Sequence, residues 1–390
     1  MLIVIDTYRN GDEHAPFNAA FLTVLTKVNN KKSLQFFALD LHLLSVEKIL
    51  CQNGINGDNW NFSNVSTISK RNSTIGILIS YLVSSFHDLR LMINSNQHDL
   101  IFFATVNPLS LLNVKLLNIF LRRKIYIVLH GELEYLNKSN DISHSIKTRF
   151  IRMWFRNVFW RFLNTNIKYV VLGKSILDSL NSFKSFGLKS SNFLVINHPY
   201  FYPTKIDNDL SSSKVLNIAT VGHLSTKKMS HLIFSLAKIM EPEIKENKIS
   251  ISIIGNVSAC IKPYLGNCLI SQNIGDIFLT RKEYELGFNQ LHYVVFFYPD
   301  TTYKFIASGA FFDCIAFEKP VIAVKNSFFQ YYFDKYGDIG YLCEDIFEMK
   351  SFINGYDEKR YLRQIDNIRK MKQDLSIEKI ASEFKALLEI

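Results

Sequence analysis

The chain alternates short apolar runs with amphipathic helical patterns, and this alternation occurs twice, on either side of a polar stretch. Buried strands that alternate with helices form parallel sheets, because a crossover connection must link strands that run in the same direction. The strand-like runs of the first half lie at 2–5, 34–39, 100–104, 125–129, 169–172 and 193–196. Helical patterns lie between several of them, near 17–28, 73–94 and 109–122. The first half therefore predicts a parallel α/β sheet.

A linker-like stretch at 201–214 separates the two halves, since it contains a proline, several charges and a serine run. After it the alternation restarts, with strand-like runs at 215–221, 249–254, 293–298 and 321–324. We therefore expect an α/β protein with two Rossmann-like domains, at 1–200 and 215–370, that face a central cleft. The tail at 371–390 has a helical pattern with Ser376 as its N-cap, and this helix could pack back on the first domain.

Composition narrows the class of protein. The 390 residues suffice for two domains with separate cores, and 48% hydrophobic with 21% charged residues indicates a globular chain. The apolar run at the N-terminus is too short for a signal peptide, and no stretch reaches about 18 uninterrupted apolar residues. Five cysteines without a Cys-x-x-Cys spacing indicate a reduced, cytoplasmic compartment. The net charge of +10 favours an anionic partner, and the absence of nucleic-acid-binding signatures favours a nucleotide or a membrane surface.

The segment 308–324 has the pattern of a nucleotide-binding unit. Ser308 and Gly309 begin a short helical stretch, and a Lys-Pro pair separates it from a buried strand. The unpaired N–H groups and positive dipole end of such a helix suit a phosphate group. Asp313, within this helix, can accept hydrogen bonds from a sugar diol. The alternative is an ordinary βαβ unit in which Asp313 caps a helix.

These segments, in this order, resemble the GT-B glycosyltransferases, in particular the GT4-like group. In that group an acidic residue seven positions before the proline of a Gly-x-Pro turn contacts the nucleotide ribose. Asp313 stands at that position before Pro320, and Glu318 replaces the usual glycine.

The resemblance departs from the family at the first glutamate of its Glu-x7-Glu motif. That glutamate would fall at position 305, which is Phe305 here. Either another residue, such as Tyr303 or Ser308, makes the sugar and phosphate contact, or this subfamily dispenses with it.

A second motif of the family, Gly-Arg-Leu followed by a phosphate-binding lysine, has a counterpart at the start of the second half. Gly222 keeps its place and His223 replaces the arginine. The resemblance implies that Lys228, or its neighbour Lys227, holds the diphosphate, where a lysine can neutralise the leaving charge. The alternative is a solvated pair of surface lysines.

A third piece is the strand 125–129, which ends in His-Gly-Glu-Leu-Glu. His130 falls where the family places a histidine beside the transferred sugar, and such a residue could also move a proton. Glu132 or Glu134 could serve as a base for an acceptor hydroxyl. A lone histidine at a strand end is more often structural, which is the alternative.

The loop after the first strand contains Gly11, Asp12 and His14. GT-B proteins use a glycine-containing loop here to approach the bound donor or acceptor, and glycine permits close backbone contact. The alternative is a polar surface loop.

Two further segments carry charge patterns. On a helix at 147–162, Arg149, Arg152 and Arg156 would form one stripe, with Trp154 among the apolar residues that cover most of the rest. Such a helix can lie in a membrane interface. The alternative is a core-packing helix whose arginines face solvent or bind the phosphates of a lipid-linked acceptor. The Asp-x-Asp sequence at 207–209 lies in the linker, and we interpret it as solvated.

The resemblance implies a glycosyltransferase on the inner face of the cytoplasmic membrane. It would move a sugar from a nucleotide-sugar donor to a lipid-linked glycan in bacterial O-antigen, capsule or lipopolysaccharide biosynthesis. No metal or other cofactor is expected, because lysines and the helix dipole offset the leaving charge. Two alternatives remain: a nucleotide-sugar epimerase of GT-B-like fold, and a non-catalytic partner in a polysaccharide assembly complex.

Overall fold

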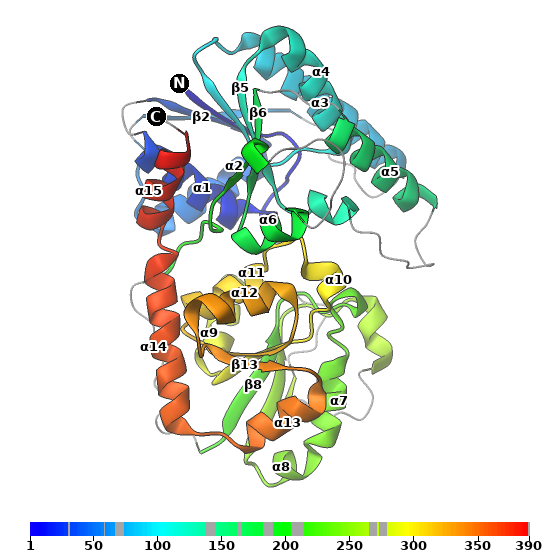
Figure 1. The fold of residues 1–390 in the computed structure, drawn as a ribbon, viewed down its shortest axis with the longest axis vertical. Helices are drawn as coiled ribbons and strands as arrows, with labels where there is room; N and C mark the ends of the chain where they lie inside the picture. The colour runs from blue at the N-terminus through cyan, green and yellow to red at the C-terminus, as the bar shows by residue number, and fades with distance from the viewer. Residues whose placement is uncertain are drawn as a thin grey trace. The chain divides into compact units, whose positions relative to one another are not determined.

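The computed structural model describes residues 1–29, 32–57, 59–66, 74–136, 146–161, 166–181, 190–203, 214–264, 271–272 and 279–388. The chain divides into two compact units (Figure 1). Unit 1 contains Met1–Phe201, Phe305–Ala307 and Leu375–Ile390, and unit 2 contains Tyr202–Lys304 and Ser308–Asp374. The Asp-x-Asp sequence at 207–209 and most of the expected linker lie outside the described residues.

Unit 1 is built on a seven-stranded parallel sheet with the order β3-β2-β1-β4-β5-β6-β7. Its strands are β1 (Leu2–Asp6), β2 (Leu34–Ala38), β3 (Trp60–Asn64), β4 (Leu100–Phe103), β5 (Lys124–Leu129), β6 (Ile167–Val171) and β7 (Phe193–Val195). Its helices are α1 (Ala15–Val28), α2 (Asp40–Gln52), α3 (Thr74–Asn94), α4 (Pro108–Leu121), α5 (Ile146–Arg161), α6 (Lys174–Asn181) and α15 (Ile377–Leu388), with 3-10 turns η1 (Glu132–Leu136) and η2 (Ser190–Asn192). All six strands expected in the first half are present.

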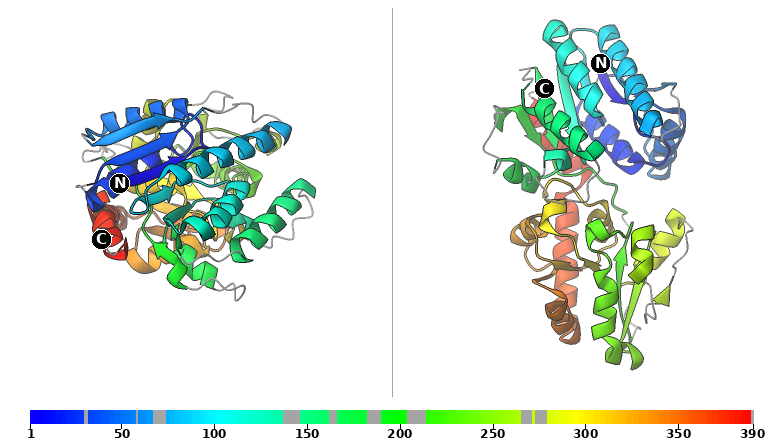
Figure 2. Two further views of the ribbon diagram at one scale, coloured as in Figure 1. Left: turned by 90° about the horizontal axis from the view of Figure 1, so that it is seen from above. Right: turned by 90° about the vertical axis from the view of Figure 1, so that its right-hand side faces the viewer.

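Successive strand side chains of unit 1 point to opposite faces of the sheet and so form two cores. Val4 and Phe102 pack on the face covered by α1, α2 and α15. Ile5 and Phe103 pack on the other face, which α3, α4 and α5 cover side by side (Figures 1 and 2). On the first face the ring centroids of Phe384, in α15, and Phe21, in α1, are 6.2 Å apart. The C-terminal helix is therefore part of the core of unit 1.

Unit 2 is built on a six-stranded parallel sheet with the order β10-β9-β8-β11-β12-β13. Its strands are β8 (Leu216–Val221), β9 (Ile249–Ile254), β10 (Ser271–Gln272), β11 (Tyr293–Phe296), β12 (Val321–Val324) and β13 (Gly340–Cys343). Its helices are α7 (Leu232–Ile239), α8 (Glu241–Lys245), α9 (Arg281–Asn289), α10 (Asp300–Tyr303), α11 (Gly309–Ala316), α12 (Ser327–Tyr336), α13 (Ile346–Asn354) and α14 (Glu358–Asp374), with 3-10 turns η3 (Thr226–Lys228) and η4 (Ala259–Tyr264). The two parallel α/β sheets confirm the expected fold class.

Candidate functional site

The candidate site of unit 2 lies where its strands end. Gly222 follows β8 and Tyr298 follows β11, and the carboxyl ends of parallel strands share one edge of a sheet. Gly222 has a φ of 81°, and a Cβ added there would lie 3.8 Å from the Cβ of Ala310 in the first turn of α11. A Cβ on Gly255, after β9, would collide with the carbonyl of Gly222. These glycines let the two loops and α11 approach each other closely.

Aromatic packing joins the predicted lysine to the start of α11. The Tyr298 ring stacks on Tyr303 with centroids 3.8 Å apart, and Lys228 Nζ lies 5.8 Å from the Tyr298 centroid. Ser308 Oγ donates a hydrogen bond of 3.3 Å to Tyr298 Oη. Burial raises the pKa of Tyr298 to about 12, so its phenol remains neutral. The sequence did not single out Tyr298, although it ends the strand-like run 293–298.

The start of α11 has the positive character expected of a phosphate site. Ser308 caps the helix by accepting a hydrogen bond from the backbone N–H of Phe311, at 3.3 Å. A Cβ added at Gly309 would meet no atom within 4 Å, so space lies in front of the helix. Burial, together with the charge of Lys227, lowers the pKa of Lys228.

The other two basic candidates lie further out. His223 and Lys227 are both exposed, whereas Lys228 is half-buried. Burial and the charge of Lys228 lower the pKa of His223, which favours its neutral form. Lys228 contacts the aromatic pair of the site through the Tyr298 ring.

Asp313 lies in α11 with only 8% of its surface exposed. Its Oδ1 accepts a hydrogen bond of 3.2 Å from Arg281 Nη1, and its Oδ2 accepts one of 3.1 Å from Tyr284 Oη. Both donors lie in α9, which Thr280 and Glu283 begin with a reciprocal capping box. A ribose diol at Asp313 would share the carboxylate with these two side chains, because each oxygen can accept further hydrogen bonds.

Two departures from the family motif have physical explanations. Glu318 has a φ of 53°, in the left-handed region that favours the family's glycine. Its carboxylate binds Arg369 Nε at 2.7 Å and Lys372 Nζ at 3.3 Å, which offsets the strain. Phe305 is 1% exposed and belongs to the core of unit 1, so this position carries a packing side chain.

In unit 1 the predicted residues His130, Glu132 and His14 lie together with Arg9. The ring centroids of His130 and His14 are 4.6 Å apart, and His130 Nε2 donates to the carbonyl of Ala104 at 3.0 Å. Burial and the charges of His14 and Arg9 hold the pKa of His130 well below its ordinary value, so its ring is neutral and its Nδ1 is an acceptor.

Glu132 Oε2 accepts a hydrogen bond of 2.7 Å from the backbone N–H of His130. Its Oε1 lies 3.9 Å from Arg9 Nη2, and burial raises its pKa. Glu132 therefore holds the turn after β5 in place. Burial and Arg9 also lower the pKa of His14 to about 4.

Asp6, at the end of β1, organises a buried polar cluster that the sequence did not reveal. It accepts hydrogen bonds from Thr105 Oγ1 at 2.5 Å and Asn18 Nδ2 at 2.7 Å. His42 Nδ1 donates a hydrogen bond of 2.7 Å to the carbonyl of Gly11. This bond holds the loop after β1, which the sequence predicts to approach the donor or acceptor. Asp12, in the same loop, is exposed. In the sequence, Asp6 directly follows the expected strand at 2–5, and this position could have marked it as a candidate site residue.

The basic helix α5 divides its apolar residues between core and surface. Phe155 and Phe159 are fully buried, while Phe150 and Met153 are 58% and 56% exposed and Trp154 is 37% exposed. Arg149 is exposed, and Arg152 and Arg156 are half-buried. The apolar residues of this helix thus do not form one core-facing stripe.

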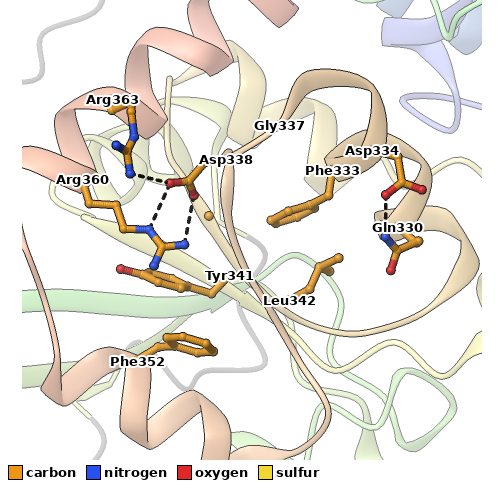
Figure 3. Close-up of a pocket in the computed structure, with 11 residues that line it drawn as sticks. Gln330, Phe333, Asp334, Gly337, Asp338, Tyr341, Leu342, Phe352, Arg360 and Arg363 are labelled. Carbon is orange, nitrogen blue, oxygen red and sulfur yellow. Dashed lines mark hydrogen bonds and ion pairs between the residues drawn. The ribbon is translucent and has the colours of Figure 1, made fainter.

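A cavity of about 480 Å³ in unit 2 is a separate feature (Figure 3). Asp338 Oδ2 binds Arg360 Nε at 3.0 Å and Arg363 Nη2 at 3.2 Å. The Arg360 guanidinium lies 4.3 Å from the ring centroid of Tyr341. Because Asp338 precedes β13, the cavity lies at the amino-terminal edge of the sheet, opposite the candidate site. Within the described parts of both units, no three His, Cys, Asp or Glu side chains group as metal ligands.

Solved structures share this architecture along the whole chain. HepE of Anabaena, in complex with UDP-glucose, matches with a TM-score of 0.64 and 14% identity over 100% of this chain and 99% of that one. WaaG, a glycosyltransferase involved in lipopolysaccharide biosynthesis, matches with a TM-score of 0.61 and 10% identity, over 99% of this chain and 98% of that one. A putative UDP-N-acetylglucosamine 2-epimerase from Listeria monocytogenes matches with a TM-score of 0.61 and 11% identity, over 100% of this chain and 95% of that one.

This likeness confirms the GT-B fold, with its two Rossmann-like domains. At such low identity it establishes the fold alone. No protein-family model matches the sequence, and no curated protein matches it.

Proposed function

We propose that the protein is a GT4-like glycosyltransferase that moves a sugar from a nucleotide-sugar donor to a glycan acceptor. The observation that carries this proposal is the meeting of Lys228, Tyr298 and the start of α11 at one sheet edge of unit 2. The fold adds support, because HepE with the same fold binds UDP-glucose and WaaG is a glycosyltransferase.

The donor diphosphate would bind between Lys228 and the N-terminus of α11, in the space in front of Gly309. As the bond to the sugar breaks, negative charge grows on the diphosphate, and the ammonium and the helix dipole stabilise it without a metal. Gly222 lets the backbone approach the donor, with His223 and Lys227 on the same loop. Asp313 would bind the ribose with Arg281 and Tyr284.

The sugar and acceptor side would use unit 1. His130, neutral because of burial, would accept a hydrogen bond from a sugar hydroxyl through Nδ1. Glu132 would hold His130 and act on the acceptor hydroxyl, with Gly11, Asp12 and His14 in the adjoining loop. In unit 2, Tyr303 or Ser308 would replace the missing acidic side chain at position 305.

The acceptor is, in this proposal, a lipid-linked oligosaccharide of bacterial O-antigen, capsule or lipopolysaccharide biosynthesis, and the protein works in the cytoplasm on the inner face of the membrane. Supporting observations are the net charge of +10 and the exposed Arg149 beside Arg152, Trp154 and Arg156 in α5. These side chains suit lipid phosphates and headgroups.

The donor site is tested with a panel of UDP-, GDP- and dTDP-sugars and membrane-derived acceptor. Lys228→Met should weaken nucleotide binding about ten-fold or more by calorimetry, because a charge-assisted contact to phosphate is lost. Lys227→Met is the matched control and should change affinity less than about three-fold. Equal losses of nucleotide affinity in the two lysine variants would contradict the proposed donor site. Full transfer activity of Asp313→Ala would contradict it as well.

The alternative of an epimerase is favoured by the likeness to the Listeria protein. An epimerase would convert free UDP-sugar with no acceptor present, whereas a transferase requires one. The buried Phe305 is the observation that favours a non-catalytic partner protein. Failure of wild-type protein to bind any nucleotide of the panel would decide for that alternative.

A further inference from the structure

Helix α3 is amphipathic in the direction opposite to that of an ordinary surface helix. Its outer face carries large apolar side chains, among them Leu78, Leu82 and Phe86, which are 56%, 60% and 63% exposed. Its inner face carries Ser84 and Asp88, both 2% exposed. In a protein surrounded by water alone, the apolar face of a helix turns inward. The reversal indicates an apolar medium outside α3.

The polar inner face is firmly bonded and therefore fixes the rotation of the helix. Thr7 Oγ1 lies 2.7 Å from Ser84 Oγ and donates to Asp88 Oδ1 at 2.7 Å. Asn113 Nδ2, in α4, donates to Ser85 Oγ at 2.7 Å. Turning α3 to hide its apolar side would break these bonds and bury unsatisfied polar groups.

The adjacent helix α4 has the same reversal. Ser110 and Asn118 are fully buried, whereas Ile119 and Phe120 are 52% and 81% exposed. Helix α5, next in the same layer, exposes Phe150. Figures 1 and 2 show the three helices side by side over one face of the sheet. The helices thus form one layer, and we call the exposed apolar side chains of this layer the outer apolar surface.

Charge identifies what covers the outer apolar surface. The three helices contain seven Lys or Arg residues, of which Lys115 is buried, and one acidic residue, the buried Asp88. Arg90, at the end of α3, and Arg122 and Lys124, after α4, are exposed. An apolar surface bordered by cations matches a bilayer with anionic headgroups. A two-fold contact with a second copy would instead bring these cations together.

By length and hydropathy one described helix, at Ile75–Asn94 in α3, could cross a membrane, with a mean hydropathy of 1.2. Crossing would place Asp88 and the serines in hydrocarbon, whereas lying in the interface keeps their bonds to Thr7 and Asn113. We infer that the outer apolar surface of α3, α4 and α5 docks in the plane of an anionic lipid bilayer.

This inference rests on the proposed function in one respect: both proposals place the protein at a membrane surface. Vesicle binding is measured without nucleotide or acceptor, so a failure to bind lipid and a failure to transfer sugar are separate results.

The test is cosedimentation with vesicles of phosphatidylglycerol and phosphatidylethanolamine. The double variant Leu78→Gln with Leu82→Gln should lower the vesicle partition coefficient by about ten-fold or more, because two inserted side chains lose their apolar transfer. The matched control is Leu41→Gln with Leu44→Gln in α2, where the side chains are 58% and 55% exposed. That control should bind like wild type. Both pairs are exposed, so unchanged unfolding midpoints will show that both variants fold.

Four results would overturn the inference. The first is that wild type does not bind the vesicles. The second is vesicle binding by the Leu78/Leu82 variant equal to that of wild type. The third is equal binding of wild type to phosphatidylcholine vesicles, which would remove the role of anionic headgroups. The fourth is a wild-type dimer in lipid-free buffer that dissociates in the Leu78/Leu82 variant, since a second copy would then cover the surface.

Discussion

Replacing Asp88 with asparagine tests the polar inner face of α3 through the pH dependence of stability. Asp88 is 2% exposed, and burial raises its pKa from an ordinary 3.8 to about 7. Hydrogen bonds from Thr7 and Ser110 oppose this rise, and the nearby charge of Asp6 adds to it. The folded chain therefore binds this proton more tightly than the unfolded chain does.

The sign of the effect follows from that difference. The stability that protonated Asp88 contributes is fully present below about pH 4, and it is lost as the pH rises to about 7 and above. A difference of about three pH units corresponds to about 4 kcal/mol in the free energy of unfolding. Asparagine does not titrate, and its Oδ1 can accept the hydrogen bond from Thr7. The stability of Asp88→Asn relative to wild type should thus rise by about 4 kcal/mol between pH 4 and pH 8.

The assay is urea unfolding followed by tryptophan fluorescence, because all three tryptophans lie in the sequence of unit 1. Asp178→Asn, which removes an exposed carboxylate of the same unit, is the control and should differ from wild type by about 0.5 kcal/mol or less. A difference between Asp88→Asn and wild type that is the same at pH 4.5 and pH 8 would refute the reasoning.

Three further predictions concern stability and binding. Glu318→Ala should be less stable than Glu318→Gly by about 1 kcal/mol in chemical unfolding followed by circular dichroism, because both lose the ion pairs and only glycine is unstrained at a φ of 53°; the reverse order would contradict this. Gly255→Ala should lower the free energy of unfolding by about 3 kcal/mol or more, because its Cβ would collide with the carbonyl of Gly222. Gly309→Ala should keep the free energy of unfolding within about 1 kcal/mol of wild type but weaken nucleotide binding. Equal stabilities of the two variants would count against the close approach of the loops. Phe384→Ala should destabilise unit 1 by about 3–5 kcal/mol in the fluorescence assay, and the exposed control Leu387→Ala by about 0.5 kcal/mol or less; similar losses would mean that α15 is not part of the core.

The sequence predicts the central strands well because a parallel strand is buried on both faces. Leu100–Phe103, for example, has four buried apolar residues in a row. Strand β3, at the sheet edge, was missed because its polar side chains do not form such a run. In β13, Gly340–Cys343, the run is short and begins with glycine, which obscures the pattern.

The candidate site was predictable to the extent that its residues follow strand ends. Gly222 could be identified in this way, because it directly follows a strand-like run. Ser308 could be identified because it and Gly309 begin a helical pattern. Arg281 and Tyr284 could not, since they reach Asp313 from another helix and only the tertiary fold brings them together. The rotation of α3 was equally hidden, because hydropathy shows that two faces differ but not which one turns inward.

The division of unit 1 into separate chain segments has a consequence for biosynthesis. Its core includes Phe305 and Phe384, which lie beyond Phe201 in the chain. At about 5–20 residues per second, a ribosome needs on the order of ten seconds or more to travel from Phe201 to α15. Throughout that interval the surface of α1 that receives Phe384 stays uncovered. The core of unit 1 is therefore completed only after the whole of unit 2 has been translated.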